Sequence, residues 1–122
     1  MGIMDEDPLT ELTDIHRKVI RRIEKIDIPV MAEIDFPPYK VDIYIPDAHM
    51  AVEVDGPHHT KKRDEKRDTY LYETYNLPTI RITQGQAKKA HIIKDIVREA
   101  YEMWIESAEF RYAEVKEKIP WL

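Results

Sequence analysis

The chain has 122 residues, 43% of them hydrophobic and 35% charged, which is enough for one folded domain with its own core. It contains no cysteine, which excludes disulfides, thiolate zinc sites and cysteine nucleophiles. With 19 basic and 24 acidic residues the net charge is −5, which argues against a protein that coats nucleic acid by bulk positive charge but leaves room for a local basic patch.

No membrane or export signal is visible in the sequence. No apolar run approaches the roughly 18 to 20 residues that a membrane span needs. The first residues, Met1 to Thr10, are acidic and lack the basic-then-apolar order of a signal peptide. We therefore expect a cytoplasmic protein that does not interact with a membrane.

The first half of the chain is predicted to form a helix and then hairpin-linked strands. Apolar residues at three- and four-residue steps predict a helix that begins at Pro8 and is closed by Pro29. Strict alternation over Lys40–Ile45, and again over Met50–Asp55, predicts two strands joined by a turn at Pro46. The polar face of the first of these strands would carry Lys40, Asp42 and Tyr44.

The second half is predicted to alternate helix, strand and helix. Charged, helical sequence covers Lys61–Tyr75, a strand covers Pro78–Thr83, and one last helix runs from Ala87 to about Val115. The order of helix, two or three strands, helix, strand and helix predicts a mixed α/β fold with a central β-sheet flanked by helices. We expect a single domain over residues 1–122, with a core at about 8–104 and a C-terminal helical extension at 105–122.

Acidic residues are predicted to gather at one end of this sheet. Glu53 and Asp55 are two residues apart on a strand, so they project from one face about 6.5 to 7 Å apart. Asp42 lies on the polar face of the strand expected to pair with it. Carboxylates this close require a proton or a cation, and all-oxygen ligands suit Mg²⁺ or Mn²⁺. The alternative is a solvated sheet face without function, which is common in alternating strands.

Histidines follow the acidic strand directly. His58 and His59 come after Gly56-Pro57 and are general-base candidates near neutral pH. Together with Asp55 they offer an alternative zinc site, although no fourth ligand is evident. His16 and His49 have no partner at metal-ligand spacing, and we expect His16 to be a surface residue.

One stretch is locally basic. The predicted helix after the histidines opens with five cations in seven residues, and Arg81 lies on the polar face of the following strand. Such a run is often only a solvated helix face, but beside the acidic cluster it indicates a wall that contacts phosphates. The predicted nucleic-acid contacts are Lys61, Lys62, Arg63, Lys66 and Arg81.

These motifs resemble a known family of nucleases. The sequence has Val41-Asp42-Ile43, then Glu53-Val54-Asp55-Gly56-Pro57-His58-His59, then Asp64-Glu65-Lys66-Arg67, then Thr79-Ile80-Arg81. The pattern is similar to the core of the PD-(D/E)XK nuclease superfamily and, more narrowly, to the small endonucleases related to the very-short-patch-repair (Vsr) enzymes. The resemblance covers about Pro8 to Trp104.

The resemblance implies a restriction-endonuclease-like fold and metal-dependent hydrolysis of DNA phosphodiesters. It implies that Asp42, with one or both of Glu53 and Asp55, holds Mg²⁺ or Mn²⁺, which activates the attacking water. His59 is implied as the general base or as the group that orients the water.

Other roles follow from the same resemblance. It implies that Asp64 steadies the histidine or a metal-bound water, and that Arg67 contacts phosphate or supports an acid. The helix-borne acid of the family falls on Glu11, with Glu24 as the alternative. Asp55 stands where the wider superfamily has lysine, so the positive charge must come from His59, Arg67, Arg63 or a second metal.

Two other functions stay open at this point. The first is a resolvase of Holliday junctions or other branched DNA, which requires a dimer. The second is a non-catalytic nucleic-acid-binding module of the same fold. The resemblance implies that DNA is the substrate. With no recognition domain attached, we expect an enzyme that cuts with little sequence preference, reads a DNA structure, or depends on a homodimer or a recruiting protein partner for specificity.

Overall fold

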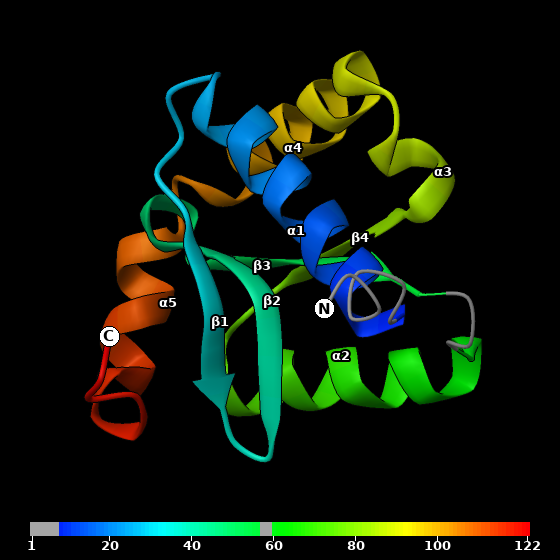
Figure 1. Cartoon of the computed structure of the whole chain (residues 1–122). Helices are drawn as coiled ribbons and strands as arrows, with labels where there is room; N and C mark the ends of the chain where they lie inside the picture. The colour runs from blue at the N-terminus through cyan, green and yellow to red at the C-terminus, as the bar shows by residue number, and fades with distance from the viewer. Residues whose placement is uncertain (1–7, 57–59) are drawn as a thin grey trace.

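The protein is built on a four-stranded mixed β-sheet with helices on both faces (Figure 1). The computed structural model describes residues 8–56 and 60–122, and the side chains of 14–56 and 60–122. The elements in chain order are α1 (Pro8–Glu24), β1 (Met31–Phe36), β2 (Tyr39–Ile45), the 3-10 turn η2 (Pro46–Ala48), β3 (Met50–Asp55), α2 (Lys61–Tyr75), β4 (Thr79–Thr83), α3 (Gln84–Ala87), α4 (Ala90–Trp104), α5 (Ala108–Val115) and the 3-10 turn η3 (Lys116–Lys118).

The strands lie in the order β1-β2-β3-β4. The first two pairs are antiparallel, and β3 pairs with β4 in parallel through the crossover helix α2. The predicted mixed α/β sheet flanked by helices is therefore confirmed, and β1 is the third of the hairpin-linked strands.

The ends of α2 have local causes, because the Thr60 side chain accepts a hydrogen bond from the Arg63 N–H and Asn76 takes the left-handed conformation at the C-cap.

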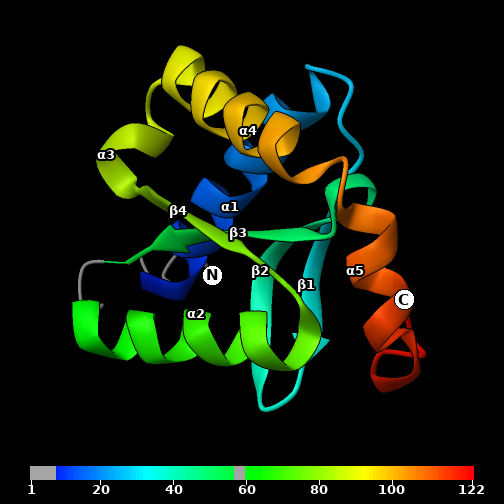
Figure 2. The same ribbon diagram turned by 180° about the vertical axis from the view of Figure 1, so that it is seen from behind.

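Both faces of the sheet are buried, each under its own pair of helices. Helices α1 and α4 cover one face, and α2 and α5 lie on the other side, as the two opposite views show (Figures 1 and 2). The expected polar position of Tyr44 is therefore wrong, because the residue is only 2% exposed and lies in the cluster under α2 and α5. A strand covered on both sides loses the simple alternation of a half-buried strand.

The predicted single helix from Ala87 to about Val115 is also wrong. The chain forms α3, α4 and α5 instead, with a turn over 105–107. Val97 of α4 packs in the cluster with α1, whereas Val115 of α5 packs in the cluster with α2 on the opposite face. One straight helix does not reach both faces of the sheet.

Nowhere in residues 8–56 and 60–122 does a helix have both the length and the apolar character needed to cross a membrane.

Candidate active site

The sheet opens where β2 and β3 separate. The pairing of these strands runs from Ile45 opposite Met50 to Ile43 opposite Val52. Beyond the pair of Ile43 and Val52, the backbone N–H of Val54 in β3 donates to the side-chain oxygen Oδ2 of Asp42 in β2 at 3.0 Å. A side-chain carboxylate thus takes the hydrogen bond that a strand carbonyl would otherwise receive, and it is fixed at the end of β3.

Glu53 lies beside Asp42 at this opening. Its side chain is buried, with 5% of the residue exposed. Burial, followed by a hydrogen bond with Asp42 and the charge of Asp42, raises the pKa of Glu53 to about 9, although the positive charges of Arg67 and Arg81 oppose the shift. At neutral pH Glu53 therefore keeps its proton.

Arg67 of α2 contacts this pair from the face of the sheet that α2 covers. Its Nη2 donates to Oε1 of Glu53 and, at 2.6 Å, to the carbonyl oxygen of Lys40. The guanidinium lies 5.2 Å from the centre of the Tyr39 ring. Of the two roles that the sequence pattern suggested for Arg67, this structure contains the contact with an acid. The same guanidinium places positive charge beside Glu53.

Arg81 binds three carboxylates and so joins β4 to β3 and α2. It donates to Asp55 at 2.7 Å and to both oxygens of Asp68 at 3.0 and 2.7 Å, and it lies 3.4 Å from Asp64. Burial lowers the pKa of Arg81, but the hydrogen bonds that it donates to Asp68 and Asp55, together with the charges of Asp68 and Asp64, outweigh burial and raise the pKa. A contact between Arg81 and nucleic acid stays a prediction, since this guanidinium already faces three acids.

The structure brings together two of the three predicted metal ligands. Asp42 and Glu53 are neighbours, whereas Asp55 is bonded to Arg81. Among the described side chains, no three Asp, Glu or His groups come together in an arrangement that would hold a metal ion. Two carboxylates still form a chemically suitable site, because Mg²⁺ is often bound by one or two carboxylates together with substrate phosphates.

Some predicted site residues lie outside the described part of the chain. These are His58, His59 and the side chain of Glu11. The alternative helix acid, Glu24, is exposed at the C-terminal end of α1.

The sequence analysis missed His16, which it placed on the surface. The structure turns His16 of α1 toward the opening, with Nε2 3.6 Å from Oδ2 of Asp42 and 20% of the side chain exposed. Helical spacing contained the signal, because His16 precedes the buried Val19 and Ile23 by three and seven residues and shares their face of the helix. An imidazole from α1 is thus available beside the carboxylate pair.

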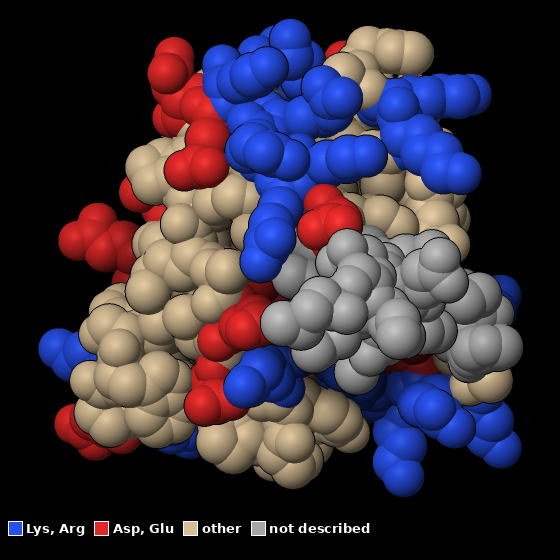
Figure 3. All heavy atoms as spheres, viewed as in Figure 1, with Lys and Arg blue, Asp and Glu red and all other residues tan. Residues whose placement is uncertain are grey.

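Four predicted nucleic-acid contacts lie together at the start of α2. Lys61, Lys62, Arg63 and Lys66 are all exposed. They belong to a basic region over the start of α2 in the space-filling view (Figure 3). Their position fits the predicted contact with phosphates, which stays a prediction.

Comparison with known proteins adds one relationship. No protein-family model matches the chain, and no curated protein matches its sequence. Its structure is similar to that of the catalytic domain of the homing endonuclease I-Bth0305I, with a TM-score of 0.64 over 75% of this chain and 96% of that one, at 16% sequence identity. At this identity the similarity shows a shared fold, that of an endonuclease catalytic domain.

Proposed function

We propose that this protein is a metal-dependent endodeoxyribonuclease that hydrolyses DNA phosphodiesters with an activated water. The observation that carries the proposal is the pair formed by Asp42 and Glu53 at the opening between β2 and β3. A buried carboxyl group and a half-buried one side by side are unfavourable for the fold, so they indicate a site that receives a cation. The fold shared with an endonuclease catalytic domain supports the same reaction class.

Asp42 and Glu53 are the residues that would hold the ion. Both supply oxygen ligands, which suits Mg²⁺ or Mn²⁺ better than zinc. When bound, such an ion polarises the phosphate and lowers the pKa of a water molecule. Oδ1 of Asp55 accepts a hydrogen bond from Arg81, so we assign Asp55 the role of orienting β3 against β4.

Neighbouring backbone and side-chain groups orient Asp42 and Glu53. The Val54 N–H holds Asp42 in place, and Arg67 keeps the Glu53 carboxyl group oriented as its proton leaves. His16 beside Asp42 is suited to accept or donate a proton at the edge of the site. We keep the resemblance-based roles of His59 as general base, Asp64 as its support and Glu11 as a further acid, together with the placement in the Vsr-like branch, as parts of this proposal.

A plasmid relaxation assay with Mg²⁺, Mn²⁺ or EDTA tests the proposal. We expect nicking that requires the metal and falls at least about a thousandfold in Asp42→Asn, since a metal ion supplies several kcal/mol of transition-state stabilisation. Asp95→Asn is the matched control, because Asp95 is exposed on α4 and changes the charge equally.

Other results would point to the alternatives. A folded protein that binds DNA but cleaves none of the duplex, single-stranded or branched forms with either metal contradicts the proposal and leaves a binding module. Cleavage restricted to four-way junctions, together with a dimer in size-exclusion chromatography, identifies a resolvase.

A further inference from the structure

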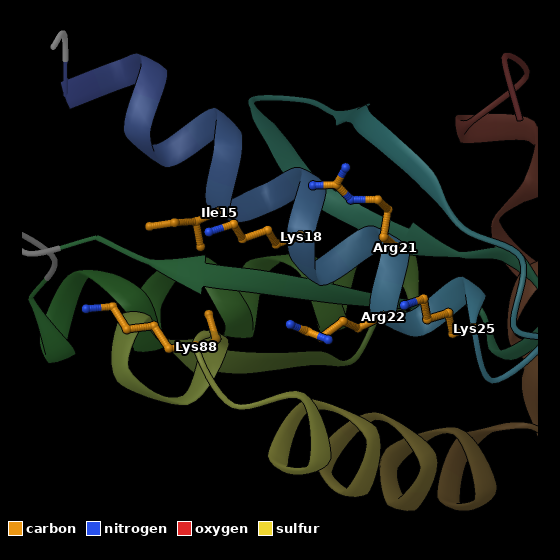
Figure 4. Close-up of a pocket in the computed structure, with 7 residues that line it drawn as sticks. Ile15, Lys18, Arg21, Arg22, Lys25 and Lys88 are labelled. Carbon is orange, nitrogen blue, oxygen red and sulfur yellow. The ribbon is translucent and has the colours of Figure 1, made fainter. Parts of the chain in front are cut away.

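A strongly basic groove lies between α1 and α3 (Figure 4). Its volume is about 400 Å³. We call it the α1–α3 groove, and its lining residues are Ile15, Lys18, Arg21, Arg22, Lys25, Ala87 and Lys88. Five of these are cations and none is acidic, in a chain whose net charge is −5.

Four of the groove cations, three in α1 and one just after its last residue, lie on one face of the helix. Lys18, Arg21, Arg22 and Lys25 follow at steps of three, four and seven residues from the first, so their side chains project to one side. Like charges at this spacing repel each other by about 0.2 to 0.5 kcal/mol per pair. Such an arrangement costs stability and calls for an anion.

The groove offers these charges no internal partner. None of its five cations forms an ion pair with any residue in the described parts of the chain. The Nε of Arg22 is buried, and no acceptor for it exists among the described atoms. The groove therefore holds a positive potential that an anion from outside would neutralise.

We propose that the α1–α3 groove binds the sugar–phosphate backbone of DNA, which rests on the proposed nuclease function for the identity of the polyanion. The polar lining consists of Lys and Arg, which are the side chains that most often contact phosphate oxygens. From Lys18 to Lys25, one residue past the end of α1, the helical rise is about 10 Å, which matches about three nucleotides of one strand at a rise of 3.4 Å each.

The position of the groove fits a strand that continues into the candidate site. Helix α1 carries His16, which faces Asp42, next to Ile15 of the groove. Helix α3 follows Thr83, which pairs with Asp55 at the end of β3. The candidate site thus lies between α1 and α2, and both basic regions, over α1 and over the start of α2, are seen on one face (Figure 3).

The test is the salt dependence of binding to a fluorescent random-sequence duplex, measured by anisotropy in EDTA so that no cleavage takes place. The variant is R21Q/K25Q, which changes two exposed groove cations. The control is K116Q/K118Q, which removes the same charge from η3 at the other end of the chain. Melting curves check that both variants fold.

We expect R21Q/K25Q to reduce the slope of log K against log salt by about 2 between about 50 and about 200 mM, and to weaken binding about tenfold for any sequence. K116Q/K118Q should bind as the wild type does. Equal slopes in the two variants, or no binding by the wild type, would overturn the assignment. So would competition by poly-glutamate as strong as by DNA at equal charge, because the groove would then be a site for acidic polypeptides.

The two proposals fail in different ways. If Asp42→Asn abolishes nicking while R21Q/K25Q binds DNA normally, the nuclease stands and the groove assignment is lost. If the wild type never cleaves but the groove variant binds DNA less well, the groove assignment stands without the nuclease.

Discussion

Two polar clusters at the sheet, one buried and one partly buried, differ in how completely their polar groups are paired. One surrounds Arg111 of α5, whose donors reach the carbonyl oxygens of Ala48, His49, Asn76 and Trp104 and the hydroxyl of Ser107 at 2.6 to 2.9 Å. The other is the pair of Asp42 and Glu53, in which two acids lie together.

Hydrogen bonding around Arg111 is complementary throughout. The neutral His49 ring uses both of its nitrogens. Its Nε2 donates to the Tyr75 carbonyl oxygen at 2.8 Å, and its Nδ1 accepts from the Tyr44 hydroxyl at 2.7 Å. Burial, ahead of the charge on Arg111, lowers the pKa of His49 to about 4. The cluster joins α5 to the sheet and leaves no group for chemistry.

The acid pair, in contrast, is only partly compensated. Glu53 keeps its proton up to a pKa of about 9, and the Nε of Arg67 is buried with no acceptor among the described atoms. The comparison teaches that complete pairing marks a structural cluster and incomplete pairing marks a site kept ready for a ligand.

The largest expected effect is on the structural cluster. Arg111→Ala leaves several buried carbonyl groups without donors, so we expect unfolding free energy to fall by at least about 3 kcal/mol. Urea denaturation measures it, with Lys116→Ala, an exposed position just after α5, as a control expected within about 0.5 kcal/mol. A loss below about 1 kcal/mol for Arg111→Ala would remove the distinction between the two clusters.

The second prediction concerns the pH dependence of stability. The pKa of Glu53 is raised from 4.5 to about 9 on folding, so the folded state holds a proton that the unfolded state has lost. Stability from this group is therefore complete below about pH 4.5 and decreases as pH rises toward 9, by up to about 1.4 kcal/mol per pH unit. Glu53→Gln should abolish this decrease in urea titrations in EDTA.

A matched variant and an opposite slope make this measurement decisive. Glu102→Gln, at an exposed position of α4, should keep the wild-type decrease. The lowered pKa of His49 acts in the other direction, since its stabilisation is present above about pH 6.5 and is lost toward about pH 4. Glu53→Gln should still lose stability as the pH falls from about 6.5 to about 4, because His49 is unchanged. If Glu53→Gln also lost stability as the pH rises toward 9, Glu53 would not be the cause of that loss.

How far the sequence predicts this structure depends on whether a feature is local. Helix α2 and strand β3 have the predicted bounds because charge pattern, alternation and the caps at Thr60 and Asn76 act within each segment. The approach of Asp42 to Glu53 also followed from strand period and a short hairpin.

Features set by distant packing were not predictable from those patterns. The turn at 105–107 interrupts continuous helical spacing, because α4 and α5 pack on opposite faces of the sheet. The binding of three acids by Arg81 depends on the parallel register of β3 and β4. The cations of α1 were visible at helical spacing, but the second wall of the groove, with Lys88, is formed only when α3 packs beside α1.

The smallest expected effect extends the comparison to the groove. If its cations, like the acid pair, are held together at a cost, then R21Q/K25Q removes repulsion between positions three and four apart and should stabilise the DNA-free protein by about 0.5 kcal/mol, which raises the melting temperature by a few degrees at low salt. Differential scanning fluorimetry at about 10 mM and about 1 M salt measures it, and the gain should vanish at high salt because the repulsion is then screened. K116Q/K118Q should show no such gain. A lower melting temperature for the groove variant at both salt concentrations would mean that these side chains stabilise the fold, as Arg111 does, and that the groove belongs with the structural cluster.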